Sequence, residues 1–567
     1  MEIKSLGDLL RDSCRRHASN IAMLAPGKKE FETISYSQLY EKVHAYAGVV
    51  KSLGVVRGDK LVILSENCVE WALTDWACQT LGVIVVPIYP TLPADQAAYI
   101  VKDCEAKIVV AGDESQKKKI DGIEGVEVAM LRGAGSISEL AASKANEIPK
   151  AEWEAGIDEV QLDDIATIIY TSGTTGLPKG AMLAHRGFIM LFGSIRQNIP
   201  VDENDRFLCF LPMSHVFERT DGQYLPISLG GSIVYAKSLM TLAKDMANSK
   251  PTVMLVVPRF LESTMDKILD NAKKEKGIKK FLFDLALSQG KKKFHGKFAP
   301  LFGLTNKVVG AKIREKVGGR LRFFVAGGAA LPAHVAEFFG AFSLKIIQGY
   351  GLTETYSGVC VNHPDRIRQN TVGELIPGVE LKIAEDGEIL FRGAARMVGY
   401  YKLPEETAKA IDADGWFHTG DIGEFDGKYL KITDRKKDLL VLGNGKNVAP
   451  QPIENKLRSS HFIQEAVVLG DGMEYCIALI VPNMETVADK LGKKDIAKPS
   501  EDPDVKALIK SEIDQINKTL ANFEMVKKHS ILDKAFSIDS GELTPTLKVK
   551  RKVVKEKYQS LIDAMRN

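Results

Sequence analysis

The chain has 567 residues, of which 45% are hydrophobic and 26% are charged. A chain of this length is enough for about two to four domains with large hydrophobic cores. The formal net charge of +3 argues against a nucleic-acid binder, and no apolar run approaches the roughly 18 residues that a membrane span needs. Scattered cysteines without a C-x-x-C pair argue against a disulfide framework or a zinc site. We therefore expect a cytoplasmic, multidomain protein.

Helices and apolar strands alternate in the first third of the chain. Ser35 and Gln38 have the spacing of a capping box and predict a helix from there to about Leu53. Short apolar strands are predicted at residues 60–64, 83–88 and 107–111. A helix that includes residues 71–73 is predicted between the first two strands, and a helix at residues 94–103 between the last two. This alternation predicts a doubly wound α/β sheet that is buried on both faces.

More short apolar runs follow, at residues 165–170, 253–257, 321–325 and 345–348. Several of these predicted strands end in a polar or glycine-rich loop. Because ligands bind at the carboxyl ends of strands in open α/β sheets, we expect the functional residues in these loops.

The sequence changes in character after about residue 375, where Asp-Gly turns at residues 386–387, 414–415 and 426–427 separate short strands. A hairpin at residues 465–481 and a Lys-rich helical tail follow. We expect an α/β fold with a large N-terminal domain at residues 1–434, built of doubly wound sheets plus a β-rich subdomain at about 375–434. A hinge at residues 435–438 joins it to a small mobile α+β lid domain at residues 439–567.

The strongest motif is a loop after the strand at residues 165–170. It reads Tyr170-Thr171-Ser172-Gly173-Thr174-Thr175-Gly176-Leu177-Pro178-Lys179-Gly180. Glycines let backbone N–H groups turn toward an anion, hydroxyl groups add neutral donors, and Lys179 supplies a positive charge. The loop therefore predicts a phosphate site. Because Gly180 follows the lysine and the glycine spacing differs, the loop is not a Walker A motif.

A second loop, Gln348-Gly349-Tyr350-Gly351-Leu352-Thr353-Glu354-Thr355, follows the strand that ends near Ile347. A tyrosine between glycines is suited to lie against a nucleotide base, and the hydroxyl and carboxylate beside it suit a phosphate and Mg²⁺. A third strand end has the small residues Ala326-Gly327-Gly328-Ala329, which let a ligand approach the backbone. A close-packed turn between strand and helix is an equally good interpretation of this third loop.

Two further motifs lie in and after the β-rich region. Asp421 ends the segment at residues 414–421, and its carboxylate is suited to accept hydrogen bonds from both hydroxyl groups of a ribose. The charged run Asp434-Arg435-Lys436-Lys437-Asp438 lies at the predicted domain boundary. Taken alone, such a run is more typical of a solvated surface than of a functional site.

These motifs, in this order, resemble the adenylate-forming (AMP-binding) superfamily and, within it, the long-chain acyl-CoA synthetases. The resemblance covers nearly the whole chain. It implies that ATP or AMP is bound by Thr171, Ser172, Gly173, Thr174, Thr175, Gly176, Lys179, Gly327, Gly328, Ala329, Gln348, Gly349, Tyr350, Gly351, Thr353, Asp421 and Arg435. It also implies that Thr174 and Glu354 hold Mg²⁺, and that Lys437 and Asp438 form the hinge.

The same resemblance implies an acyl site and a catalytic lysine. Residues 211–220 resemble the segment that lines the acyl site of the fatty-acyl branch, and they include His215. A polar histidine of the core is the alternative for His215. Residues 544–551 resemble the segment with the catalytic lysine, where the alignment favours Lys548 and leaves Lys550 as the alternative. The implied catalytic residues are therefore Lys548, Glu354, Thr174 and His215.

The implied reaction is the ATP-dependent activation of a long-chain fatty acid to an acyl-adenylate, followed by transfer of the acyl group to CoA. Mg²⁺ is the implied cofactor, fatty acid, ATP and CoA are the implied substrates, and the C-terminal domain is implied to rotate about Lys437 between the steps. Residues 211–220 contain no Asp, which favours a fatty acid over an amino acid. The alternatives are a ligase that loads a carrier protein or activates an aryl acid, and a non-catalytic nucleotide or lipid binder of the same fold.

One stretch departs from the balanced charge of the chain. Residues 271–320 contain fourteen Lys or Arg and three Asp or Glu residues, and their lysines are interleaved with aromatic residues at 279–283 and 291–294. Such a surface is suited to peripheral contact with an anionic membrane. A solvated helical insertion is the alternative interpretation.

Overall fold

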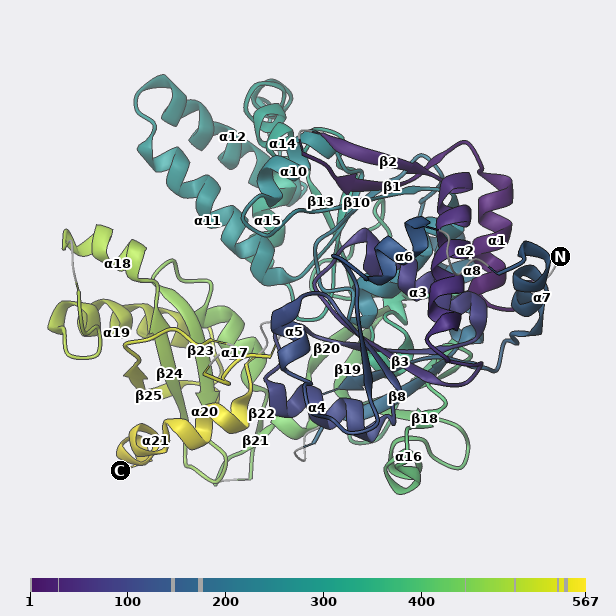
Figure 1. Cartoon of the computed structure of the whole chain (residues 1–567). Helices are drawn as coiled ribbons and strands as arrows, with labels where there is room; N and C mark the ends of the chain where they lie inside the picture. Colours follow the sequence, from purple (N-terminus) through teal and green to yellow (C-terminus); the bar gives the residue numbers. More distant parts are fainter. Residues whose placement is uncertain are drawn as a thin grey trace. The chain divides into compact units, whose positions relative to one another are not determined.

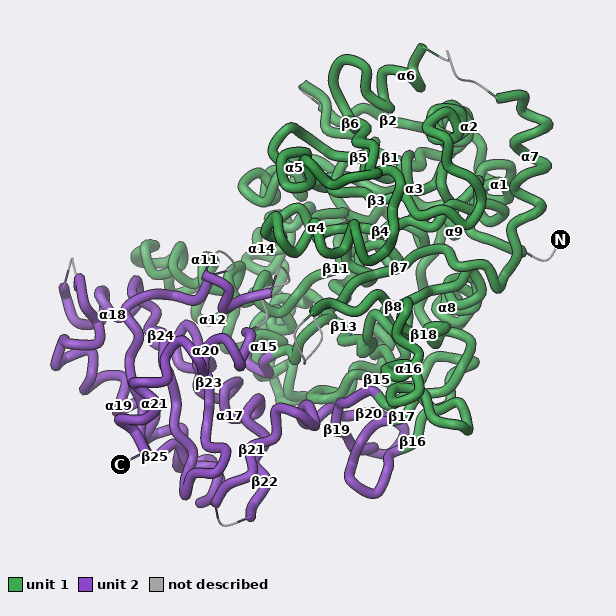
Figure 2. Tube along the Cα trace, turned by 60° about the horizontal axis from the view of Figure 1, so that its bottom comes forward, with its two compact units in different colours: residues 1–331, 335–382, 390–418 green, residues 332–334, 383–389, 419–567 purple. Residues whose placement is uncertain are grey.

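The computed structural model describes residues 3–28, 30–143, 148–171, 177–443, 445–493, 496–537, 540–544 and 549–566. The chain divides into two compact units, which are drawn in different colours in Figure 2. The first unit consists of residues 1–331, 335–382 and 390–418, and the second of residues 332–334, 383–389 and 419–567. The predicted domain limits and the hinge at residues 435–438 stay predictions.

One sheet of the first unit has the strand order β18-β8-β7-β4-β3-β5-β6. Its strands are β3 (Lys60–Leu64), β4 (Ile84–Ile88), β5 (Ile108–Ala111), β6 (Glu127–Met130), β7 (Ile165–Thr171), β8 (Lys179–Ala184) and β18 (Gly399–Tyr400). Strands β3 to β7 run parallel, with α3 (Val69–Leu81) and α4 (Ala94–Asp103) in the connections, as the alternation predicts. Strands β8 and β18 are antiparallel additions that the sequence analysis missed.

A second sheet of the first unit runs in the order β15-β14-β13-β12-β11-β9-β10-β1-β2. Its strands are β1 (Ile21–Pro26), β2 (Phe31–Ser35), β9 (Arg206–Cys209), β10 (Ser232–Tyr235), β11 (Val253–Val256), β12 (Phe323–Ala326), β13 (Lys345–Tyr350), β14 (Cys360–Val361) and β15 (Gly373–Leu375). The inner strands are parallel, and antiparallel strands flank them at both ends. The predicted strands at residues 253–257, 321–325 and 345–348 are confirmed with bounds shifted by one or two residues.

The predicted capping box begins α2 (Tyr36–Ser52). The Ser35 hydroxyl oxygen accepts a hydrogen bond from the Gln38 N–H at 3.2 Å, and the Gln38 Oε1 accepts one from the Ser35 N–H at 2.9 Å. These two bonds satisfy backbone donors that the first turn of a helix leaves without partners. The prediction of this helix start is confirmed.

The β-rich region contains β16 (Val379–Ile383), β17 (Glu388–Gly393), β19 (Phe417–Asp426), β20 (Tyr429–Arg435) and the helix α16 (Pro404–Ala410). The Asp-Gly turns that predicted it have Gly387, Gly415 and Gly427 at φ values of 84°, 81° and 65°. Only glycine adopts this left-handed region without a steric cost from Cβ. The turn predictions are therefore confirmed.

The second unit contains a sheet of order β23-β24-β25. Its elements are β23 (Ile463–Leu469), β24 (Cys476–Pro482), β25 (Val526–Ile531), α17 (Pro450–Leu457), α18 (Met484–Leu491), α19 (Pro503–Asn517), α20 (Arg551–Lys557) and α21 (Gln559–Arg566). Strands β23 and β24 form the predicted hairpin. Alternate residues of β24 enter two separate hydrophobic clusters, one on each face of the sheet. This double burial explains why β24 is apolar at every position.

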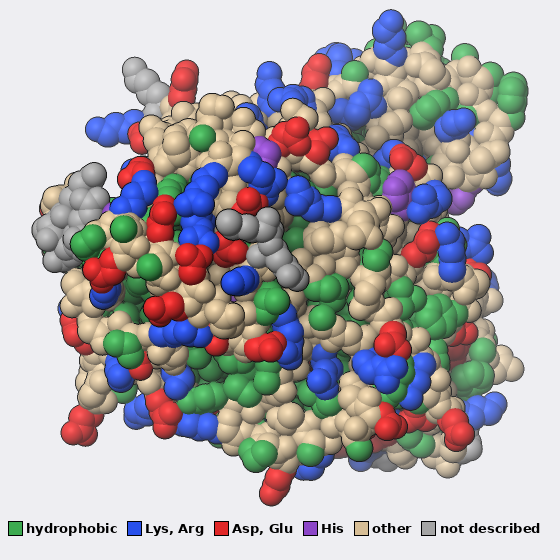
Figure 3. Space-filling model, turned by 90° about the vertical axis from the view of Figure 1, so that its right-hand side faces the viewer, with side chains coloured by type: hydrophobic (Ala, Val, Ile, Leu, Met, Phe, Trp, Pro, Cys, Tyr) green, Lys and Arg blue, Asp and Glu red, His purple; other side chains and the backbone are tan. Residues whose placement is uncertain are grey.

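The basic stretch at residues 271–320 is helical. It covers the end of α11 (Pro258–Lys274), followed by α12 (Ile278–Phe294), α13 (Phe302–Thr305) and α14 (Ala311–Lys316), and Figure 1 shows α11 and α12 side by side. No helix within the described residues is both long and apolar enough to cross a membrane. On the face shown in Figure 3, Lys and Arg side chains are interspersed with Asp and Glu side chains.

Candidate active site

Parallel strands of the second sheet end in line with one another. β9, β11, β12 and β13 are neighbours, and Ala326 pairs with Val256 on one side and with Gln348 on the other. Because the strands are parallel and in register, the loops that follow them leave the same edge of the sheet. The structure therefore brings three predicted segments to one edge: residues 211–220, 326–329 and 348–355.

Two glycines in these loops mark close approaches. A Cβ atom on Gly327 would lie 3.1 Å from the Phe217 ring, and one on Gly351 would lie 2.0 Å from the carbonyl oxygen of Ser357. Gly328 has a φ of 82°, which favours glycine. Gly327 thus lies close to Phe217 of the predicted acyl segment, and the role of this loop in nucleotide binding stays a prediction.

Tyr356 and Ser357, directly after the second loop, have φ values of 65° and 132°. Positive φ in two successive residues other than glycine is costly and persists only where packing enforces it. Tyr356 is fully buried; its hydroxyl group accepts a hydrogen bond from the Ala184 N–H at 2.6 Å and donates one to the Ala184 carbonyl oxygen at 3.0 Å. The hydroxyl group therefore joins the loop after β13 to the end of β8. Sequence reasoning missed this residue, which no motif marked.

Lys179 and Glu354 lie in one cluster of the first unit. The Lys179 ammonium group forms an ion pair with Glu406 of α16 and lies 5.5 Å from the centre of the Tyr400 ring. The Tyr400 hydroxyl group donates a hydrogen bond of 2.8 Å to Oε1 of Glu354. Burial raises the pKa of Tyr400, and the charge of Glu354 raises it further, so the tyrosine stays a donor.

This arrangement comes from the antiparallel strands that sequence analysis missed. Tyr400 of β18 pairs with Ala181 of β8, and Thr171 of β7 pairs with Lys179 at the start of β8. Strand β8 therefore places both Lys179 and Tyr400. Predicted phosphate-site residues Ser172, Gly173, Thr174, Thr175 and Gly176 lie outside the described residues.

His215 lies in the segment between β9 and a π-helix at Glu218–Tyr224. Its Nδ1 accepts a hydrogen bond from the Phe217 N–H at 3.1 Å, and its ring lies 6.4 Å from the ring of Tyr89, which follows β4. His215 thus lies between the loops of the two sheets of the first unit. π-Helical segments are frequent at functional sites.

The π-helix contains buried ionisable side chains: an arginine in an ion pair, and two carboxyl groups whose pKa is raised. The Arg219 guanidinium group forms an ion pair with Asp75 at 2.5 Å, with exposed side-chain fractions of 1% and 0%, so this pair is part of the core. Burial raises the pKa of Glu218 to about 8 and that of Asp221 to about 7. Both carboxyl groups are therefore wholly or partly protonated at neutral pH.

In the second unit, Asp421 of β19 lies opposite Arg435 of β20. The Arg435 Nε is 3.0 Å from Oδ1 of Asp421, whose side chain is 5% exposed. Asp434 accepts hydrogen bonds from the N–H groups of Arg435 at 2.6 Å and Gln451 at 3.2 Å, and burial raises its pKa to about 6. Asp421, predicted to bind ribose, and Arg435, predicted to bind the nucleotide, thus form an ion pair on a hairpin.

The predicted hinge residues Lys437 and Asp438 lie in a short 3₁₀ helix (Lys436–Asp438) that directly follows β20. The predicted catalytic Lys548 lies outside the described residues. Its alternative, Lys550, precedes α20, and its N–H donates a hydrogen bond of 2.7 Å to the Glu542 carbonyl oxygen. A choice between the two lysines stays a prediction.

Two family models match the chain. The model of the AMP-binding enzyme matches residues 10–401, and that of the AMP-binding enzyme C-terminal domain matches residues 437–567. The chain belongs to the AMP-binding enzyme family. The resemblance of its motifs to the adenylate-forming superfamily is confirmed.

Within the AMP-binding family, the chain is similar to ligases of the long-chain branch. It is 34% identical to long-chain-fatty-acid–CoA ligase FadD15 of Mycobacterium bovis, an alignment that covers 94% of this chain and 92% of the relative. It is 30% identical to long-chain-fatty-acid–CoA ligase 1 of Homo sapiens, over 94% and 82% of the two chains. This likeness confirms the predicted resemblance to long-chain acyl-CoA synthetases.

Solved structures of the AMP-binding family share the fold. The ATP-bound structure of MatB from Rhodopseudomonas palustris matches with a TM-score of 0.75 at 23% identity, over 98% of this chain and 99% of that one. The Mycobacterium tuberculosis fatty acyl CoA synthetase matches with a TM-score of 0.66 at 23% identity, over 98% and 99%. The predicted fold, a large α/β N-terminal domain with a smaller C-terminal domain, is confirmed.

Proposed function

We propose that the chain activates a long-chain fatty acid with ATP, as an acyl-adenylate, and then transfers the acyl group to CoA. The observation that carries this proposal is the cluster in which Tyr400 lies between Lys179 and Glu354, in a chain 34% identical to a long-chain-fatty-acid–CoA ligase. A cation and a carboxylate held close together suit a polyphosphate and its metal ion. The choice of a long-chain fatty acid as the substrate rests on the names of the similar ligases.

The chemistry requires such a cluster because a carboxylate is a poor electrophile toward a thiol. Adenylation joins it to the α-phosphate of ATP, and pyrophosphate leaves. A carboxylate that approaches a triphosphate meets repulsion of about 4 kcal/mol for each pair of unit charges 4 Å apart at an effective dielectric constant of 20. Lys179, the first residue of β8, would offset this repulsion on the leaving pyrophosphate.

The residues present fit Mg²⁺. Magnesium in nucleotide sites is usually held by one or two carboxylates together with phosphates and water, and Glu354 offers such a carboxylate with its Oε1 fixed by Tyr400. Glu354 and Thr174 would hold the ion, which would neutralise charge on the phosphates. Within the described residues no cluster of three His, Cys, Asp or Glu side chains forms a separate metal site.

In the second unit, Asp421 is suited to accept hydrogen bonds from the ribose hydroxyl groups, and Arg435 fixes the carboxylate of Asp421 with an ion pair of 3.0 Å. Lys548 would bridge the fatty-acid carboxylate and the α-phosphate. The rotation about Lys437 and Asp438 between the two steps is part of the proposal. It is supported by the lack of buried side chains in the 3₁₀ helix that contains them, because a hinge needs few packing contacts.

The acyl site belongs to the segment that contains His215. Phe217 packs on Gly327, and His215 lies near Tyr89, so the segment connects the nucleotide loops with the interior of the first unit. The protonated state of Glu218 and the pairing of Arg219 with Asp75 leave this interior with little net charge. That environment suits an apolar chain better than an ammonium group.

A product assay tests whether CoA is the acceptor of the acyl group. Purified protein with palmitate, ATP, Mg²⁺ and CoA should form palmitoyl-CoA and AMP in equal amounts. Accumulation of palmitoyl-adenylate without thioester would instead favour a carrier-protein acceptor, and activity with benzoate but not palmitate would favour an aryl acid.

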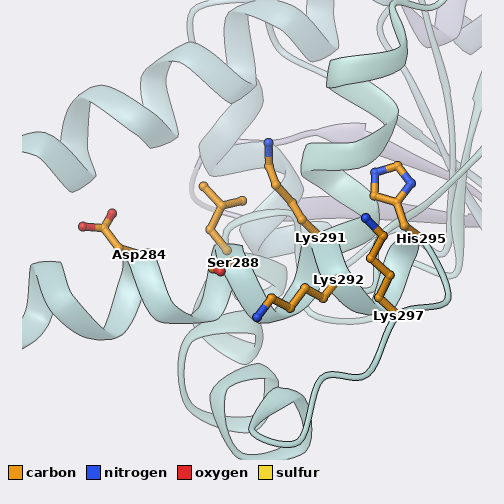
Figure 4. Close-up of a pocket in the computed structure, with 7 residues that line it drawn as sticks. Asp284, Ser288, Lys291, Lys292, His295 and Lys297 are labelled. Carbon is orange, nitrogen blue, oxygen red and sulfur yellow. The ribbon is translucent and has the colours of Figure 1, made fainter.

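We further propose that the basic stretch contacts anionic membranes from the cytoplasm. Apolar side chains in and after α12 are exposed: Ile278 (77%), Phe281 (64%), Phe298 (86%) and Leu304 (66%). They lie in the same stretch as a surface pocket of about 450 Å³ lined by Asp284, Leu287, Ser288, Lys291, Lys292, His295 and Lys297, most of which Figure 4 labels. Lysines beside exposed apolar groups fit an anionic lipid surface.

Not every residue of the stretch supports membrane contact. Phe283 and Phe294 pack against the core, and Lys291 forms an ion pair with Glu337 at 2.6 Å.

Sedimentation with vesicles of phosphatidylcholine and phosphatidylglycerol, compared with vesicles of pure phosphatidylcholine, tests the proposed membrane contact. We expect binding to the anionic vesicles only, weakened in Phe298→Ser and unchanged in Val56→Ser, which replaces another exposed apolar side chain (63%) outside the stretch. Equal binding by both variants would contradict it.

A further inference from the structure

Lys179 is neutralised by a protein carboxylate. Its ammonium group forms an ion pair with Glu406, and the side chains are only 18% and 30% exposed. Glu406 also forms an ion pair with Lys409 one turn later in α16, at 2.7 Å. Hydrogen bonds from Lys179 and from Lys409 lower the pKa of Glu406 to about 2, so its negative charge is present at every working pH.

The three side chains are held by two elements of the first unit. Lys179 begins β8, while Glu406 and Lys409 lie on α16, which is attached to β18 by a hydrogen bond of 2.8 Å from the Tyr400 N–H to the Thr407 hydroxyl oxygen. Because β18 pairs with β8, the position of Glu406 relative to Lys179 is fixed by backbone pairing. The ion pair is therefore a built feature of this site.

We propose that Glu406 competes with the phosphates of ATP and pyrophosphate for Lys179. This inference rests on the proposed role of Lys179 in phosphate binding. A polyphosphate that contacts the ammonium group has to displace the carboxylate or accept its repulsion. Lys409 stays beside Glu406 when Lys179 changes partner, so the released carboxylate keeps a counter-ion. Glu406 would then recapture Lys179 and favour the release of pyrophosphate.

The competition predicts the sign of a substitution effect. Glu406→Gln frees the Lys179 ammonium group and removes a negative charge that repels the phosphates, so it should tighten the binding of pyrophosphate. We expect the dissociation constant to fall about tenfold, which corresponds to about 1.4 kcal/mol. Lys409→Met should weaken binding, because Glu406 then holds Lys179 alone. In the double variant the change at position 409 should have little further effect.

Titration calorimetry of the full chain with magnesium pyrophosphate tests this inference without the need for catalysis. The neighbouring Glu405→Gln is the matched control, because Glu405 is exposed on the same helix, and we expect it to bind like the wild type. Unchanged or weaker binding by Glu406→Gln, or a Lys409→Met effect that persists in full without Glu406, would overturn the inference. Lys179→Ala separates the two proposals: if it does not weaken pyrophosphate binding, the role of Lys179 itself fails.

Discussion

The hydroxyl group of Tyr400 lies 2.8 Å from Oε1 of Glu354, and the Met397 N–H donates a hydrogen bond of the same length to the Glu354 carbonyl oxygen. The segment before α16 therefore holds Glu354 by both its side chain and its backbone. A carboxylate fixed in this way is already ordered, so it loses little conformational freedom when a metal ion and a nucleotide bind.

Tyr400→Phe should lower the rate of adenylation while it leaves the fold intact. A hydrogen bond to a charged group contributes about 1.5–3 kcal/mol, so we expect a loss of about 10- to 100-fold in kcat/KM for ATP. The Mg²⁺ concentration for half-maximal activity should rise as well, because the lost bond orients the proposed metal ligand. A loss of activity with an unchanged Mg²⁺ dependence would contradict this role of Tyr400.

Gly187 makes room for the Tyr356 ring. A Cβ atom there would lie 2.2 Å from the ring, and the ring cannot retreat because its hydroxyl group is bound to Ala184. Gly187→Ala should therefore destabilise the first unit by about 1–3 kcal/mol, in the range of overpacked cores, and reduce adenylation.

Gly193→Ala is the matched control, since Gly193 lies on the same helix, α8 (His185–Asn198), with nothing within 4 Å of its Cβ position. Alanine there should stabilise by up to about 1 kcal/mol. Thermal unfolding of both variants measures the difference, and equal midpoints would show that Tyr356 moves freely.

Glu218 should make stability depend on pH. Burial raises its pKa in the folded chain to about 8 from an ordinary value of 4.5, and Cys209 and Asp221 are the titratable groups that act on it. Between these pH values the unfolded chain releases this proton and the folded chain keeps it. The free energy of unfolding therefore falls as pH rises, by up to about 1.4 kcal/mol per pH unit for one proton.

Glu218→Gln removes this titration. The variant should match the wild type near pH 5 and exceed it in stability near pH 8, as measured by urea unfolding. Both proteins keep the pH dependence that Asp221 contributes, so the difference between the two proteins is the quantity to compare. Parallel curves across this range would contradict the burial of a neutral Glu218.

The ion pair between Arg219 and Asp75 is buried, and its loss should be costly. Arg219→Met leaves the Asp75 carboxylate without its counter-ion in the core, which costs about 3–5 kcal/mol. Arg16→Met removes an exposed pair with Asp12, whose side chains are 43% and 38% exposed, and should cost less than about 1 kcal/mol. Similar losses in the two variants would place Arg219 in a solvated environment.

The sequence predicted those parts of the fold that local patterns determine. The capping box at Ser35, the Asp-Gly turns and the predicted apolar strands of the two sheets are confirmed because each depends on a few neighbouring residues. The parallel strands β6, β9 and β10 were not predicted. Strand β8 and the edge strand β18 were missed. Strand β18 has only two residues, Gly399 and Tyr400, and its partner β8 lies far away along the chain. No local pattern marks such a strand.

The same reason limits prediction of the site. Lys179 and Glu354 belong to motifs that identify the family, but Tyr400 and Glu406 reach them only through the pairing of β18 with β8. Tyr356 likewise depends on Gly187 more than 160 residues earlier. Motifs predicted which groups carry charge, whereas the partners that fix those groups depend on tertiary structure.

The formation of an acyl-adenylate is the central claim, and isotope exchange between pyrophosphate and ATP in the absence of CoA tests it most directly. We predict that exchange by the purified chain requires both palmitate and Mg²⁺, and that Lys548→Ala abolishes it while Lys550→Ala does not. Exchange that proceeds without palmitate, or palmitate-dependent release of ADP and phosphate in its place, would contradict the account.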